Sequence, residues 1–296
     1  MDPLAPLESL LDVGRGDDLP LTPELATLYG PLRFPAHEGR PYVIGNFVTT
    51  LDGVASLSAP GLAGGGPISG SNPHDRMVMG LLRSVADAVI VGAGTLRSVP
   101  NHLWTAEYIY PVFAGPYRQL RSALGKNDSP LNVIVTARGE IDLSLPVFRS
   151  GAVKALVVST PEGARRIRKH DLPPSVGIGE VKNADAISAR AILSAVARVR
   201  PGKIFLVEGG PQLMGDFFAE KCLDELFLTL APQVAGRDGS VERPGFVAGK
   251  RFGPESPLWG TLAGVKRAGS HLFLRYAFAT EDGSPLGSGE TGRGIA

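Results

Sequence analysis

The stretch VEGGPQLMGDFF, residues 207–218, joins an apolar run to an amphipathic one through two adjacent glycines. The residues IFLV at 204–207 predict a buried strand, and residues 212–221 predict a helix. Glycines between a strand and a helix let the backbone approach an anion, to which the free N–H groups of the helix N-terminus point. Glu208 follows the strand, where a carboxylate is costly unless it has a partner or a use. This stretch therefore predicts a strand–turn–helix unit that binds an anionic ligand.

The same alternation of strand-like and helix-like segments extends in both directions from this unit. The predicted strands are residues 42–49, 88–91, 131–136, 155–159, 204–207, 225–231 and 271–278. The predicted helices are residues 72–86, 116–124, 161–170, 188–199 and 212–221. Short apolar strands separated by helices favour an α/β fold with a mostly parallel sheet and helices on both faces. No helical pattern separates the last two predicted strands, so we expect them to pair antiparallel.

Two more turns follow predicted strands and carry polar or glycine residues. Gly92-Ala93-Gly94-Thr95 offers a flexible backbone and a hydroxyl group, and Thr136-Ala137-Arg138-Gly139 offers a hydroxyl and a guanidinium. Ligands of open α/β sheets bind at the carboxyl ends of strands, where these turns lie. Three separate anion-binding turns fit a dinucleotide, although the single G-x-G-x-x-G motif is absent. Each turn alone could also be a simple tight turn.

Composition excludes several classes of protein. The 296 residues include 30 Lys and Arg against 29 Asp and Glu, which argues against nucleic-acid binding. The single cysteine, Cys222, and five scattered histidines show no metal-ligand spacing, so we expect no metal. The N-terminus lacks a basic region typical of signal peptides, and no apolar run is long enough to cross a membrane. We therefore expect a soluble cytoplasmic protein.

Six stretches together resemble the reductase domain of bacterial riboflavin biosynthesis, which is the C-terminal domain of a bifunctional deaminase-reductase. They are NFVTTLDG (46–53), ISG (68–70), ADAVIVGAGTLR (86–97), VIVTARGEID (133–142), VEGGPQLMGDFF (207–218) and DELFLTLAPQVAG (224–236). The resemblance covers residues 40–280 and implies a dihydrofolate reductase-like fold. It also implies an NADPH-dependent enzyme that reduces 5-amino-6-(5-phosphoribosylamino)uracil by hydride transfer to the sugar C1′.

The resemblance assigns roles by motif match. The residues that it implies for NADPH are Gly92, Gly94, Thr95, Thr136, Arg138, Gly209, Gly210, Gln212 and Leu213. Those for the substrate are Asn46, Thr49 and Ser69, and Glu208 or Asp52 would assist protonation. The resemblance also implies a homodimer.

The chain departs from the family pattern on the substrate side. Val54 replaces a lysine that contacts the substrate in the family, and residues 97–101 lack two family aspartates. Two alternatives therefore stay open: a related NADPH-dependent reductase of a pterin or another heterocycle, and a nucleotide-binding protein without turnover. Asp52, the acid of an Asp-Gly turn, could instead cap its own backbone.

Residues outside these motifs complete the predicted organisation. Residues 1–39 read as an extension packed on a reductase domain at 40–280, and residues 281–296 as a disordered tail. Thr22 and Pro23 predict a helix start. The aromatic segment 101–115 could cover the substrate or pack as a surface loop. His74 and Asp75 read as surface residues in the first turn of a helix.

Overall fold

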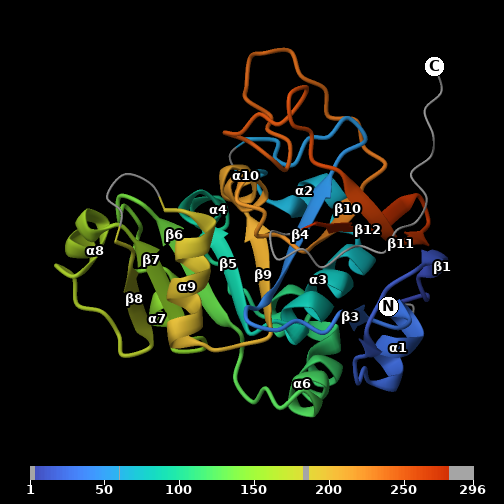
Figure 1. The fold of residues 1–296 in the computed structure, drawn as a ribbon, viewed down its shortest axis with the longest axis horizontal. Coiled ribbons are helices and arrows are strands. Elements are labelled where there is room, and N and C mark those ends of the chain that lie inside the picture. Colours follow the sequence, from blue (N-terminus) through green and yellow to red (C-terminus); the bar gives the residue numbers. More distant parts are fainter. Residues whose placement is uncertain (1–3, 60, 183–186, 280–296) are drawn as a thin grey trace.

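The computed structural model describes residues 4–59, 61–182 and 187–279, and its main feature is one large sheet (Figure 1). Ten strands form it in the order β1 (Glu8–Asp12), β11 (Gly260–Ala268), β12 (His271–Phe278), β10 (Glu225–Leu230), β4 (Tyr42–Thr49), β9 (Ile204–Gly209), β5 (Ala88–Gly92), β6 (Leu131–Thr136), β7 (Ala155–Ser159) and β8 (Val176–Glu180). The seven strands from β10 to β8 are parallel, and β12, β11 and β1 add antiparallel pairs beside β10. The parallel part therefore has all its carboxyl ends at one edge.

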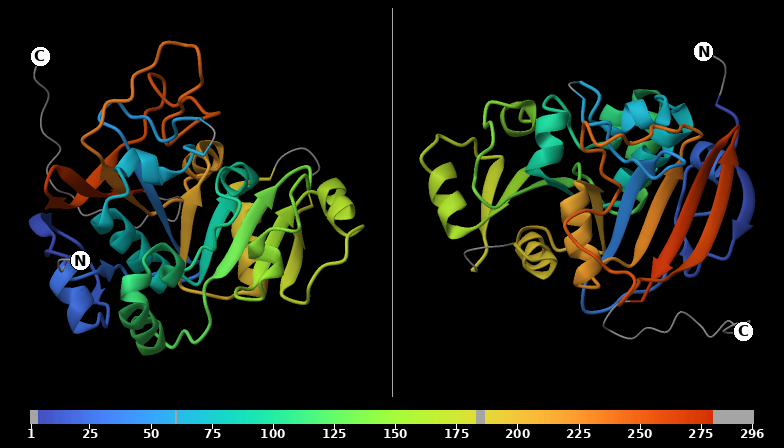
Figure 2. Two further views of the ribbon diagram at one scale, coloured as in Figure 1. Left: turned by 180° about the vertical axis from the view of Figure 1, so that it is seen from behind. Right: turned by 90° about the horizontal axis from the view of Figure 1, so that it is seen from above.

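Helices cover both faces of this sheet, as the view from above in Figure 2 shows. They are α1 (Pro23–Tyr29), α2 (Gly65–Ser69), α3 (Pro73–Val85), α4 (Ala93–Ser98), α5 (Ala106–Ile109), α6 (Ala114–Ala123), α7 (Pro146–Arg149), α8 (Pro161–Ile167), α9 (Ala189–Val199) and α10 (Pro211–Ala219). A 3₁₀ turn at Pro111–Phe113 joins α5 to α6, and β2 (Asp17–Asp18) pairs with β3 (Arg33–Phe34) in a small second sheet.

The side chains of β5 show how one strand serves two cores. Val89 and Val91 face the core that is formed with α1, α3 and α6, whereas Ala88 and Ile90 face the core that is formed with α9 and α10. All four side chains are fully buried. Strands buried on both faces read as continuous apolar runs, which is why AVIV was recognisable in the sequence.

The predicted fold class is confirmed: the sheet is mixed but mostly parallel, helices lie on both faces, and β10 and β12 pair antiparallel. All seven predicted strands and all five predicted helices are present, with small shifts at their ends. The prediction missed the strands β1, β2, β3, β8 and β11. It also made one helix too long, because α8 ends at Ile167 and not at His170.

The N-terminal residues join the main sheet through β1, which pairs with β11, and through α1, which packs into the core. The predicted helix start is confirmed, since the Thr22 hydroxyl accepts a hydrogen bond from the Leu25 amide and Pro23 begins α1. The boundary between an extension and a domain at residues 39 and 40 stays a prediction. The predicted disordered tail, 281–296, lies outside the described residues.

Two loops rise from the carboxyl edge of the sheet and lie side by side above β4 and α10 (Figure 1). One consists of residues 50–59 and 61–64, after β4, and the other of residues 231–259, between β10 and β11. Backbone hydrogen bonds join them at Leu51 to Gln233 and at Ala55 to Pro244. A further bond, from Ala248 to Pro211, ties the second loop to α10. The paired loops form one wall of the cleft described next.

Candidate functional site

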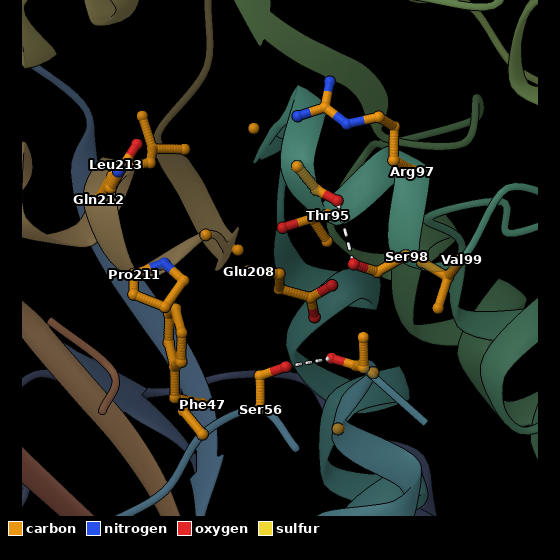
Figure 3. A pocket seen from close by; sticks show the side chains of 18 of the residues that line it. Phe47, Ser56, Thr95, Arg97, Ser98, Val99, Glu208, Pro211, Gln212 and Leu213 are labelled. Carbon is orange, nitrogen blue, oxygen red and sulfur yellow. Dashed lines mark hydrogen bonds between the residues drawn. The ribbon is translucent and has the colours of Figure 1, made fainter. Parts of the chain in front are cut away.

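A cleft of about 1270 Å³ lies at the carboxyl edge of the parallel strands, between the paired loops and α4. Residues from β4, β5, β6 and β9 form its floor. Its volume exceeds the ~300 to 1000 Å³ typical of a site for one small ligand. The cleft therefore has room for a dinucleotide and a second molecule. Figure 3 shows Glu208 between the residues of α10 on one side and those of α4 on the other.

The turn after β5 exposes backbone at the cleft surface. Gly92 and Gly94 line the cleft, and a Cβ built on either glycine comes no closer than 3.9 Å to a neighbouring atom. Thr95, one residue further along α4, also lines the cleft and can add a hydroxyl donor. The absence of side chains at these glycines keeps open a space that none of the described residues fills. That space fits a ligand lying directly on the backbone.

The turn after β9 is shaped by close packing against α4. A Cβ on Gly209 would come within 2.5 Å of the Thr95 hydroxyl oxygen, so only glycine fits there. Gly210 has a φ of 72°, which other residues rarely adopt, and it is the N-cap of α10. Gln212 and Leu213 in the first turn of α10 line the cleft. The N-terminus of α10 thus presents its backbone N–H groups at the surface where an anion can bind.

Arginines gather at the far end of the cleft, beyond the turn after β6. Thr136, Arg138, Glu140 and Arg97 line this end. Arg138 lies 3.2 Å from Glu140, and Arg166 lies 2.6 Å from the same carboxylate. These arginines lower the pKa of Glu140, the Arg166 hydrogen bond having the largest effect. Because the Arg138 side chain is 81% exposed, its guanidinium can turn toward a ligand phosphate at little cost.

The opposite end of the cleft is built around a buried ion pair. The Arg83 guanidinium donates three hydrogen bonds to the two Glu208 carboxylate oxygens, the shortest at 2.7 Å, and a fourth to the Thr105 carbonyl oxygen. The two side chains are only 2% and 4% exposed. Asn46 lies 3.5 Å from Glu208 on the other side. Glu208 is therefore held as a hydrogen-bond acceptor, which does not favour the proton-donor role considered for it.

A second carboxyl group lines this end without such a partner. Asp75, in the first turn of α3, is 5% exposed and faces the cleft. Burial raises its pKa, while hydrogen bonds from the Thr229 and Ser69 hydroxyl groups lower it. The prediction that Asp75 is a surface residue was wrong. Residues distant in sequence cover it, which the local pattern around Pro73 cannot reveal.

The aromatic segment after α4 forms the wall beside Arg83. The His102 ring lies 5.2 Å from the Trp104 ring and 4.6 Å from the Tyr108 ring, between centroids, and all three side chains line the cleft. The His102 Nε2 atom is buried and has no hydrogen-bond partner among the residues that the structure describes. Burial, assisted by the charge of Arg83, lowers the pKa of His102 to about 3. The imidazole is therefore neutral near pH 7.

Most of the residues predicted from the sequence come together in this cleft. Those that line it are Asn46, Ser69, Gly92, Gly94, Thr95, Thr136, Arg138, Glu208, Gly209, Gly210, Gln212 and Leu213. Thr49 and Asp52 do not line it. Thr49 is buried in the sheet, where its carbonyl oxygen accepts a hydrogen bond from the Ala231 amide.

The Asp52 carboxylate forms hydrogen bonds within the paired loops and does not line the cleft. Its carboxylate accepts hydrogen bonds from the Thr50 hydroxyl and from the Ala235 and Gly236 amides. These bonds, led by that of Thr50, lower its pKa to about 2. Asp52 is therefore ionised at neutral pH and joins the loop after β4 to the loop before β11. This geometry favours the interpretation of Asp52 as a residue that caps backbone amides over its interpretation as a proton donor.

The sequence analysis did not assign several residues that shape the cleft. They are Phe47, Ser56, Asp75, Arg76, Arg83 and Arg97. Val54, at the position of the family lysine, is fully buried in a small apolar cluster with Val48 and Ile68. This position therefore offers no charge to a ligand.

Comparison with known proteins identifies the family. Residues 41–266, more than half of the chain, match the family described as the RibD C-terminal domain. This chain belongs to the RibD C-terminal domain family. The family match spans every element that lines the cleft.

The individual related proteins have low sequence identity to this chain. A 2,5-diamino-6-ribosylamino-4(3H)-pyrimidinone 5′-phosphate reductase from Archaeoglobus fulgidus is 26% identical over 201 residues, which are 67% of this chain and 84% of that protein. The riboflavin biosynthesis protein RibD from Aquifex aeolicus is 24% identical over 203 residues, 68% of this chain but 49% of that protein. A crystal structure of a pyrimidine reductase-like protein from Corynebacterium diphtheriae matches with a TM-score of 0.63 and 22% identity, over 81% of this chain and 93% of that one. The similarity to this crystal structure confirms the fold.

Among the described residues, no helix is long and apolar enough to cross a membrane.

Proposed function

We propose that this protein is an NADPH-dependent reductase of a phosphoribosylaminopyrimidine. One relative is named as a reductase of such a compound, and the use of NADPH is part of our proposal. The observation that carries the proposal is the division of one cleft into two unlike ends. One end exposes glycine backbone, hydroxyl groups and arginines, as a dinucleotide requires, and the other holds buried charge, as a polar heterocycle requires.

The cofactor end fits NADPH by three features. The unfilled space over Gly92 and Gly94 admits a phosphate close to the backbone, and the N-terminus of α10 offers N–H donors to the pyrophosphate. Arg138 and Arg97 lie where they can bind the ribose 2′-phosphate that distinguishes NADPH from NADH. When bound, the cofactor supplies a hydride.

The pyrimidine end orients the substrate. Arg83 and Glu208 hold one another rigid, so each presents a fixed charge to the ring and its substituents. His102, Trp104 and Tyr108 form an apolar wall that excludes water from the reacting carbon. In the proposed reaction the ribosylamine opens to an imine, and hydride addition at C1′ with a proton on nitrogen gives the ribitylamine.

The proposal is tested by measuring the oxidation of NADPH, which is monitored as the loss of its near-ultraviolet absorbance. The two acceptors are 5-amino-6-(5-phosphoribosylamino)uracil and 2,5-diamino-6-ribosylamino-4(3H)-pyrimidinone 5′-phosphate. Turnover of either supports the proposal. If the protein binds NADPH yet turns over neither, the ribosylaminopyrimidine assignment fails.

A pterin reductase is the second candidate, and the buried carboxyl of Asp75 together with the missing lysine at Val54 favours it. A dihydropterin in the same assay separates the two. A binding protein without turnover would bind NADPH and reduce none of these acceptors.

We also propose a homodimer, which rests on the family resemblance alone. Sedimentation equilibrium should give twice the chain mass of 31.1 kDa. A mass equal to that of one chain would overturn this proposal and leave the catalytic one intact.

A further inference from the structure

One cation at the pyrimidine end of the cleft, Arg76 in α3, has no acidic partner among the described residues. The described arginines and lysines that line the cleft are Arg76, Arg83, Arg97, Arg138 and Lys250. Arg83, Arg138 and Lys250 each form a salt bridge with a carboxylate, and Arg97 lies at the cofactor end. Since no salt bridge in the described part of the chain includes Arg76, its charge is available to a ligand.

The Arg76 side chain is half-buried, and two contacts orient it. Its Nε donates a hydrogen bond of 2.9 Å to the Ile109 carbonyl oxygen, and its guanidinium carbon lies 5.9 Å from the centre of the Tyr110 ring. Its two terminal nitrogens have no hydrogen-bond acceptor among the described residues. A planar guanidinium with two free nitrogens matches two oxygens of a phosphate. Arg76 therefore has the geometry of an anion-binding residue.

The position of Arg76 on α3 sets its distance from the ion pair that faces the pyrimidine. Arg76, Met79 and Arg83 are spaced by three and four residues, so they form one stripe along the helix, and all three line the cleft. At a rise of about 1.5 Å per residue, Arg76 lies about 10 Å from Arg83 along the helix axis. A ring held at Arg83 and Glu208 would be separated from a phosphate at the end of its five-carbon sugar by a span of this order.

Burial along this stripe suits such a substrate. Arg83 is 2% exposed, whereas Arg76 is only half-buried. A phosphate bound at Arg76 keeps part of its hydration, which lowers the cost of placing its charge in the cleft. Arg83 cannot take this role, because its Nε and both terminal nitrogens already donate to Glu208 and to the Thr105 carbonyl oxygen.

A substrate phosphate needs a cation that this chain lacks at the position of the family lysine, where Val54 is fully buried. We propose that Arg76 binds the 5′-phosphate of the substrate, so that this protein selects phosphorylated over unphosphorylated ribosylaminopyrimidines. The inference rests on the proposed function. It places the phosphate between α3 and the aromatic segment, beside Tyr108 and Ile109, which also line the cleft.

The first test uses the wild-type protein. It compares the ribosylaminopyrimidine that is turned over with the same compound after removal of its phosphate by a phosphatase. The kcat/KM for the phosphorylated compound should be higher by about 100-fold or more, because a site built to hydrogen-bond one group rejects an analogue that lacks it. Equal values for the two compounds would overturn the inference.

The second test changes the residue. In Arg76→Gln the charge is lost, so kcat/KM for the phosphorylated compound should fall by about 10- to 100-fold, mainly through a higher KM. The value for the unphosphorylated compound should fall by much less. Arg76→Lys keeps the charge without the planar fork and should lie between Arg76→Gln and the wild type. Equal falls for both compounds in Arg76→Gln would show a merely structural role and overturn the inference.

Arg118→Gln is the matched control, because Arg118 is an exposed arginine of α6 that does not line the cleft. It should keep the wild-type preference for the phosphorylated compound. If it lost that preference to the same extent as Arg76→Gln, the net positive charge of the protein and not a contact with Arg76 would account for the selection, and the inference would fail.

A third test does not depend on turnover. The protein is saturated with NADP⁺, so that the cofactor end is occupied, and is titrated by calorimetry with D-ribitol 5-phosphate and with D-ribitol. Tighter binding of the phosphate by the wild type but not by Arg76→Gln supports the inference. Equal binding of the two compounds by the wild type, or a phosphate preference that Arg76→Gln retains, overturns it. Phosphate binding that depends on Arg76, with no turnover of either ribosylaminopyrimidine, would keep the phosphate site and overturn the proposed function.

Discussion

The two ends of the cleft are lined by different kinds of chemical groups. The cofactor end consists of backbone and small residues in three short turns, each continuous in sequence, such as Gly92 to Thr95. The pyrimidine end consists of buried charged side chains that come from separate elements, such as Arg83 in α3 and Glu208 in β9. A side chain fits at Gly94 in the first end without a clash, whereas the Arg83–Glu208 pair of the second end is buried in the folded core. We therefore expect ligand binding and stability to be separable at Gly94 and coupled at the ion pair.

The strongest test of this coupling is Arg83→Met. It would leave Glu208 buried without its partner, and we expect the free energy of unfolding to fall by about 3 to 5 kcal/mol. The kcat/KM should also fall, because Glu208 loses its fixed position. Urea unfolding and steady-state kinetics measure the two effects.

Arg275→Met provides the matched control for that change. Arg275 forms an equally buried pair with Glu225 between β12 and β10, away from the cleft. Its loss should destabilise the fold by a similar amount, yet the folded protein should keep its kcat/KM. Similar kinetic losses in both variants would show that the pyrimidine end depends only on global stability.

The same contrast explains what the sequence could predict. Motifs such as Gly209-Gly210 are local, and their function follows from their position between a strand and a helix. Strand β6 was predicted with its exact ends because its apolar residues are buried on both faces. In contrast, β8 reads VGIGE, and its two glycines hide the strand pattern.

Long-range pairing was not predictable. Arg83 lies 125 residues before Glu208, and only the folded sheet and the helix α3 packed on it bring them together. Asp75 follows Pro73 at the start of a helix, a pattern that is typical of exposed acids. Its burial depends on Thr229 and other residues contributed by distant parts of the chain.

The pyrimidine end should also be the more sensitive to acid. The pKa of His102 is lowered to about 3 in the folded protein, against about 6.5 in the unfolded chain. Below pH 6 the unfolded chain therefore binds a proton that the folded protein rejects, and stability falls by up to about 1.4 kcal/mol per pH unit. His102→Phe should flatten this dependence between pH 6 and pH 4, as chemical denaturation at each pH would show.

Tyr108→Phe is the control, because it alters the same aromatic wall but removes a phenol, which does not titrate in acid. It should keep the wild-type slope. A His102→Phe variant with an unchanged slope would mean that His102 accepts a proton in the folded protein, contrary to its buried position.

Gly94→Ala should separate affinity from stability at the cofactor end. An alanine Cβ at this position meets only the end of the Arg97 side chain, at 4.0 Å, so the fold has room for it. Since Gly94 lies in α4, alanine should stabilise the protein by roughly 0.5 to 1 kcal/mol. The methyl group would occupy the space assigned to a phosphate, and the NADP⁺ dissociation constant should rise by about tenfold or more.

Gly115→Ala is matched to it, since Gly115 lies in α6 with nothing within 4 Å of a built Cβ and does not line the cleft. It should raise the melting temperature without changing the affinity for NADP⁺. If Gly94→Ala behaved in the same way, the backbone of this turn would not contact the cofactor.

The smallest expected effect is at the exposed edge of the cofactor end. Arg138→Ala should reduce the preference for NADPH over NADH by roughly threefold to fivefold, the size of an interaction made by a solvent-exposed charge. Stability should not change, because the side chain packs against little besides Glu140. Arg168→Ala, which removes an exposed arginine paired with Glu180 away from the cleft, should leave the ratio of kcat/KM values unchanged. If both variants keep the wild-type ratio, Arg138 does not bind the 2′-phosphate. Arg97 is then the remaining candidate for binding the 2′-phosphate, and the exposed Arg138 does not determine the preference for NADPH.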